Sequence, residues 1–151
     1  MSGMADVDPV GGIWNWAVAG RIDEASVRSA ISDVLERPVT GMSEDAEDSA
    51  VLVDVYHVGG EFPTMIDLYL VPSVDHEITV ASAVAVELGA AVLLPDDSLN
   101  PTRYVLSEPD GTWRTVHVDE IETDEGTERR HLRPCTGADP ACAVGPERNA
   151  A

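Results

Sequence analysis

Apolar residues recur every three or four positions in two stretches of the chain, and this spacing predicts two amphipathic helices. The first runs from about Glu24 to Glu36. Asp23 precedes it and can cap it, because a carboxylate there accepts a free backbone N–H. The second lies between Asp75, a candidate N-cap, and Gly89, which suits the left-handed conformation that often follows a helix.

Segments rich in β-branched and aromatic residues predict five strands. The first two are joined through Gly59-Gly60 and form an antiparallel hairpin. The last two are joined by Glu108-Pro109-Asp110-Gly111, in which Pro presets its own φ and Gly accepts a positive φ. The predicted strands are Val51 to Val58, Thr64 to Val71, Ala91 to Leu94, Arg103 to Ser107 and Thr112 to Val118.

This order of elements, α-β-β-α-β-β-β, predicts an α+β fold: a single, largely antiparallel sheet of about five strands with two helices packed on one face. The second helix is long enough to cross over, so the strands that flank it could be parallel neighbours. Residues 13–18 are either a further short strand, with Trp14 and Trp16 on one side, or an irregular segment whose indoles cover the core. We expect one domain over 13–133, with flexible ends at 1–12 and 134–151.

The net charge of the chain limits the classes of molecule that it is expected to bind. The 151 residues include 28 Asp and Glu against 9 cationic residues, all of them Arg, so the formal net charge is -19. Such a field repels nucleic acids and anionic membrane surfaces and attracts basic proteins. Acidity can also serve solubility alone, or reflect a salty cytoplasm or a GC-rich genome. No apolar run reaches the ~20 residues of a membrane span, and no signal-peptide pattern is present, so we expect a cytoplasmic protein.

The sequence lacks motifs for catalysis or cofactor binding. A chain without Lys has no P-loop, and no G-x-S-x-G segment is present. His131, Cys135 and Cys142 are three candidate metal ligands, but structural zinc usually takes four, with closely spaced Cys pairs. We therefore predict no catalytic residue, no metal and no cofactor, and interpret the two thiols as part of the tail.

The first hairpin repeats a short pattern, because Asp54 and Tyr56 in one strand are echoed by Asp67 and Tyr69 in the other. Side chains alternate along a strand, so Asp and Tyr share a face in each. If the turn closes with Val58 paired to Pro63, the two Asp residues fall directly opposite and repel each other. Such a pair is typical of open solvent, a nearby Arg, a metal or a cationic partner, and a shift of register would remove it.

These features favour a non-enzymatic binding protein that occludes a basic protein partner. The most concrete version is an immunity or antitoxin-like inhibitor of a cationic toxin such as a nuclease, with association aided by electrostatic steering. One alternative is a DNA mimic with a double row of acidic residues along one face. Another is a small enzyme or ligand-binding domain with Asp54 and Asp67 in a pocket. The residues expected to contact the partner are Asp54, Tyr56, Asp67, Tyr69, Asp96, Asp97, Trp113, Glu120 and Glu122.

Overall fold

The computed structural model describes residues 12–41, 51–71, 76–96, 102–137 and 142, which form two helices and one eight-stranded sheet. The helices are α1 (Glu24–Leu35) and α2 (Glu77–Leu88). The strands are β1 (Gly12–Val18), β2 (Val39–Gly41), β3 (Val51–His57), β4 (Thr64–Val71), β5 (Val92–Pro95), β6 (Arg103–Ser107), β7 (Trp113–Thr123) and β8 (Gly126–Pro134). Their order across the sheet is β2-β3-β4-β1-β5-β6-β7-β8.

The predicted α+β class, single sheet and two helices are confirmed, but the predicted number of strands and order of elements are wrong. The sheet has eight strands instead of about five, and it is mixed, because β2 runs parallel to β3 while the other pairs are antiparallel. Three strands were not among the five: β1, the three-residue β2, and β8. β8 and the far half of β7 are rich in charged residues, which hide the pattern of a strand.

β1 lies inside the sheet, between β4 and β5, and is antiparallel to both. β4 and β5 therefore run in the same direction but are not neighbours, so α2 does not connect adjacent parallel strands. Trp14 and Trp16 of β1 stack with ring centroids 5.8 Å apart, and Trp16 is 1% exposed. Of the two interpretations of residues 13–18, the strand is correct, and its indoles pack in the core.

The ends of the helices follow local chemistry. At the start of α1 the Asp23 carboxylate accepts a hydrogen bond from the backbone N–H of Ser26 at 3.0 Å, as predicted. α2 is preceded by His76, which makes no capping bond with its side chain, and Asp75 lies outside the described residues. Gly89 ends α2 with a φ of 67°. No helix in the described ranges has the length and apolar character needed to cross a membrane.

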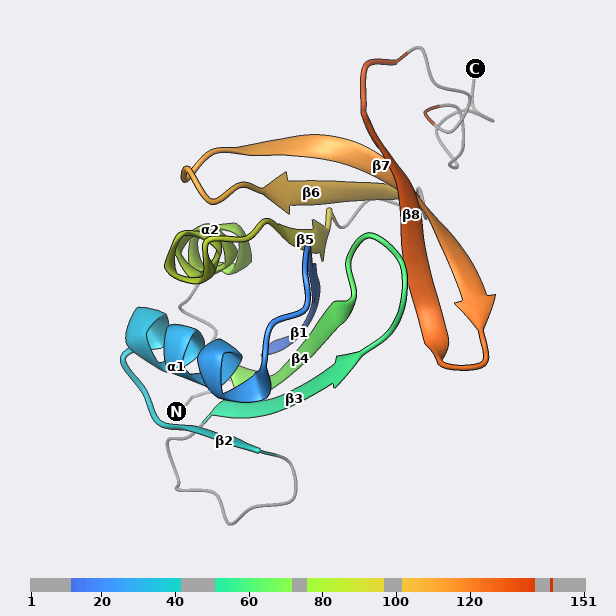
Figure 1. The fold of residues 1–151 in the computed structure, drawn as a ribbon. Coiled ribbons are helices and arrows are strands. Elements are labelled where there is room, and N and C mark those ends of the chain that lie inside the picture. Colours follow the sequence, from blue (N-terminus) through green and yellow to red (C-terminus); the bar gives the residue numbers. More distant parts are fainter. Residues whose placement is uncertain (1–11, 42–50, 72–75, 97–101, 138–141, 143–151) are drawn as a thin grey trace, which may run out of the picture.

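Two apolar cores stabilise the sheet, one on each face. The larger lies between the sheet and both helices, around which the sheet curves in Figure 1. The second lies on the opposite face, under the β6–β7 side of the sheet. Buried members of the first include Val27, Ile31, Val53, Ile66, Val84 and Leu94, and those of the second include Phe62, Met65, Leu93, Leu106 and Val116.

The β7–β8 hairpin returns to the loop between β3 and β4, beside which β8 passes in Figure 1. Gly60 forms a parallel bridge with Arg129, and the backbone N–H of Glu61 donates to the Arg129 carbonyl at 2.9 Å. The Glu61 carboxylate in turn accepts the backbone N–H groups of His131 and Leu132. Gly60 has a φ of 90°, and a Cβ there would lie 3.0 Å from the Arg129 carbonyl oxygen, so this contact requires glycine.

Candidate functional site

The β3–β4 hairpin adopts the register that opposes two carboxylates. The backbone N–H of Val58 donates to the Pro63 carbonyl at 2.8 Å and closes the turn. Asp54 is then paired directly with Asp67 across the two strands. The conditional prediction is confirmed, and a like-charge pair lies on one face of the sheet.

That face is the outer one, turned away from the helices, since the alternate residues of both strands belong to the helix-side core. The register places Tyr56 and Tyr69 on the same face as the carboxylates, with Asn15 of β1 beside Asp67. Ile13, which is paired with Tyr69, is 61% exposed, and Tyr56 is 41% exposed. We call this surface the outer-face patch; it consists of Ile13, Asn15, Leu52, Asp54, Tyr56, Asp67 and Tyr69.

The negative charge of the patch is not neutralised within it. Asn15 Nδ2 donates to Asp67 Oδ1 at 2.8 Å, but this donor is neutral. Among the described residues, neither Asp54 nor Asp67 forms an ion pair. Arg129 borders the patch, with its guanidinium Nη1 3.4 Å from Sδ of Met65. The opposed carboxylates therefore remain available to an external cation.

The phenol of Tyr56 is held in its neutral form. Partial burial raises the pKa of Tyr56, the negative charges of Asp67 and Asp54 raise it further, and Arg129 acts in the opposite direction. A neutral phenol can donate or accept a hydrogen bond, and its ring face attracts cations. Tyr56 thus adds an aromatic contact to the acidic pair.

Two of the other residues expected to contact a partner, Asp96 and Trp113, are not part of this surface. Asp96 forms an ion pair with Arg103 at 2.8 Å. Trp113 is 53% exposed, but it is paired with Ser107, whose hydroxyl contacts α2, so the indole lies on the helix side of the sheet. Asp97 lies outside the described residues. The structure therefore brings together only some of the residues that were predicted to contact a partner.

Three carboxylates of the β7–β8 hairpin form ion pairs with arginines of the same hairpin. Glu120, a predicted contact residue, reaches the Arg129 that borders the patch, whereas Glu122 accepts from the Thr127 hydroxyl near the hairpin turn. The acidic stretch thus pairs with arginines that follow it in the chain. The ion pairs are Glu120 with Arg129 (3.9 Å), Glu128 with Arg130 (2.8 Å) and Asp119 with Arg133 (3.2 Å).

A second cluster combines both cysteines with a histidine that the sequence did not single out for them. His117 Nε2 lies 3.0 Å from Cys142 Sγ, which lies 3.8 Å from Cys135 Sγ. Burial and the adjacent Cys142 thiol raise the pKa of Cys135, although the Arg103 guanidinium acts against this. The Nδ1 of the expected neighbour His131 instead lies 2.8 Å from the Asp119 carboxylate, which accepts a hydrogen bond from it. We call His117, Cys135 and Cys142 the thiol–imidazole cluster.

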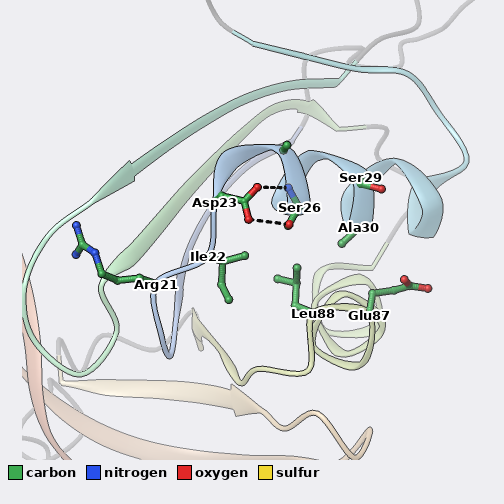
Figure 2. Close-up of a pocket in the computed structure, with 9 residues that line it drawn as sticks. Arg21, Ile22, Asp23, Ser26, Ser29, Ala30, Glu87 and Leu88 are labelled. Carbon is green, nitrogen blue, oxygen red and sulfur yellow. Dashed lines mark hydrogen bonds between the residues drawn. The ribbon is translucent and has the colours of Figure 1, made fainter.

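Two surface pockets lie away from the outer-face patch. The larger, of about 510 Å³, is formed where the start of α1 meets the end of α2 (Figure 2). Its Asp23 carboxylate is already engaged with the backbone N–H and hydroxyl of Ser26. The smaller, of about 260 Å³, lies at the start of α2 beside Asp96. Neither of these pockets is lined by Asp54 or Asp67, so they give no support to an enzyme that uses this pair of carboxylates.

Sequence reasoning did not assign Ile13 and Asn15 to a binding surface. Their alternation with Trp14 and Trp16 was visible, but nothing local shows that β1 pairs with β4, about fifty residues later. His117 was missed for the same reason, because it precedes Cys135 by 18 positions. In both cases the informative residues are neighbours only across strands.

Comparisons with protein-family models, with curated proteins and with solved structures return no match for this chain. The functional assignment therefore rests on the geometry and charge of the chain itself.

Proposed function

We propose that this protein binds a basic protein partner through the outer-face patch and occludes the cationic surface that it covers. The observation that supports the proposal most directly is the opposed pair of Asp54 and Asp67, which has no ion-pair partner among the described residues. Two like charges in opposed strand positions destabilise a hairpin. An unfavourable arrangement on an exposed sheet face is typical of a site that serves binding.

A partner side chain that fits this pair is a guanidinium. Its planar array of N–H donors can bond two carboxylates at once, which relieves their mutual repulsion. Tyr56 and Tyr69 flank the carboxylates along their strands, and the face of a tyrosine ring attracts cations. Exposed Ile13 adds an apolar contact at the edge, so the patch combines charge complementarity with anchors of the kind that dominate interfaces.

The net charge of -19 would speed the encounter with such a partner and suppress encounters with acidic proteins. In its most concrete form, the proposal is an inhibitor of the immunity or antitoxin type that covers a cationic toxin. A DNA mimic is less favoured, because it needs rows of free carboxylates, whereas the β7–β8 hairpin pairs many of its own with arginines.

The proposal is tested by affinity capture with the full chain as bait, at low and at high salt, followed by identification of the captured proteins. The test variant Asp54→Asn/Asp67→Asn removes two charges from the patch. The control variant Asp124→Asn/Glu125→Gln removes two charges from the exposed β7–β8 turn, so both variants have the same net charge.

We expect a basic protein that the wild type and the control variant capture at low salt and release at high salt, and that the patch variant fails to capture. Equal capture by both variants would show that binding follows net charge alone and would refute the assignment to the patch. Capture of no basic protein by the wild type would refute the proposed function as a whole.

A further inference from the structure

We infer that the thiol–imidazole cluster is a binding site for a thiophilic divalent cation, of which zinc is the type. The Cys135 and Cys142 sulfurs and one His117 ring nitrogen all lie within 4.8 Å of one another. Two thiolates and an imidazole are a ligand set that zinc takes in proteins, with a fourth position left to water. This site is independent of the outer-face patch, so either assignment can fail without the other.

The histidine is held in the orientation that a ligand needs. His117 is fully buried, and its Nδ1 lies 3.0 Å from the Thr102 hydroxyl. When Nδ1 carries the proton and donates it to Thr102, the lone pair of Nε2 is directed at the sulfurs. Thr102 is thus a positioning residue, because its hydrogen bond fixes the orientation of the imidazole ring.

The separations suit one ion between the three groups. Two sulfurs that each lie about 2.3 Å from a tetrahedral zinc are about 3.8 Å apart, and the Cys135 and Cys142 sulfurs are separated by 3.8 Å. The separation of His117 Nε2 and Cys142 Sγ would open from 3.0 Å to about 3.5 Å, the value for nitrogen and sulfur ligands of one tetrahedral ion. This adjustment falls on Cys142, because His117 belongs to β7 in the sheet.

Binding forms two metal–sulfur bonds and one metal–nitrogen bond, and the two thiol protons pass to solvent. The ion would join β7, through His117, to the chain just after β8 and to Cys142. Cys135 already donates its backbone N–H to the Thr115 carbonyl at 3.2 Å, so one ligand is tied to the sheet before the metal arrives. The bound ion would therefore hold Cys135 and Cys142 against β7.

Cobalt(II) is the probe, because an acidic protein binds many cations weakly at its surface, whereas cobalt reports thiolate ligation by near-ultraviolet charge-transfer bands. The reduced full chain is titrated with cobalt in excess magnesium, which occupies carboxylate sites, and zinc is then added to displace the cobalt. The variants are Cys142→Ser, Thr102→Val and, as a control, His131→Ala, with folding checked by circular dichroism.

We expect one cobalt per chain with thiolate charge-transfer bands and displacement by zinc. Cys142→Ser should lose these bands, Thr102→Val should weaken affinity by about 10- to 100-fold, and His131→Ala should retain wild-type affinity. A reduced wild type without the bands, or a folded Cys142→Ser that keeps them, would overturn the inference. Isolation of a Cys135–Cys142 disulfide whose reduced form takes up no cobalt would also overturn it.

Discussion

Replacement of Asp54 by Asn should make the protein more stable while it weakens capture of the basic partner. The opposed register brings the carboxylates of Asp54 and Asp67 side by side on an exposed face. Opposed Cβ atoms lie about 5 Å apart, and two unit charges at that distance in a water-like medium repel by about 0.8 kcal/mol. Rotation of the exposed side chains reduces this value, so we expect a gain of about 0.5 kcal/mol, or about 1 to 2 °C in Tm.

The measurement is urea unfolding at low salt and at 1 M salt. Any Asp→Asn change in so acidic a protein reduces general repulsion, so Asp124→Asn at the exposed β7–β8 turn serves as the control. The gain from Asp54→Asn should exceed that of the control at low salt and vanish at 1 M, where the screening length is only about 3 Å. In an Asp67→Asn background, Asp54→Asn should gain no more than the control, since the opposing charge is gone.

An Asp54→Asn variant that is no more stable than Asp124→Asn at low salt would refute the predicted repulsion between the Asp54 and Asp67 carboxylates. If Asp54→Asn is stabilised as expected but partner capture is unchanged, the pair exists and the reasoning that links its repulsion to function is wrong. The two readouts together therefore separate the geometry from its interpretation.

Three further predictions concern the hairpins and the second core. Gly60→Ala should be more destabilising than Gly20→Ala, because both glycines have a positive φ near 90° but only at Gly60 would the new Cβ meet the Arg129 backbone. In urea unfolding, Gly60→Ala should lose more than the ~1–2 kcal/mol that a left-handed conformation costs a residue with a Cβ. Equal losses of stability in the two variants would contradict the contact. Phe62→Ala should lose about 3–5 kcal/mol, because Phe62 is 2% exposed in the core on the outer face, and a loss near zero in the same assay would contradict that burial. The pKa of Asp119 is lowered first by the hydrogen bond with His131 and then by the Arg133 guanidinium. A carboxyl group whose pKa is lowered by folding stabilises the folded protein at pH values above the ordinary Asp pKa, and this stabilisation is lost as the pH falls through the folded-state pKa. His131→Ala should therefore raise the pKa of Asp119 in an NMR titration and reduce the loss of stability that Asp119 causes in acid.

Local patterns in the sequence were sufficient to predict both helices and the β3–β4 hairpin. Asp23 caps α1 because its carboxylate meets a backbone N–H three residues later, a contact that needs no distant partner. The opposition of Asp54 and Asp67 also follows from a nearby feature, since the closure at Val58 and Pro63 sets the register of everything between. The acidic pair on which the proposed function rests was therefore predictable from the chain.

The place of β1 in the sheet, the strand nature of the acidic stretch and the thiol–imidazole cluster were decided only by the tertiary structure. β8 pairs with β7 although it is highly charged, because cross-strand ion pairs such as Asp119 with Arg133 offset the charge. His117 meets Cys142 only because β7 and the chain beyond β8 come together in the folded sheet. An apolar alternation marks the strands of the β3–β4 hairpin, but β8 and the charged far half of β7 lack it, so their pairing is not visible in the sequence. The pairing of β1 with β4 and β5 joins segments far apart in the chain, and no local pattern encodes it.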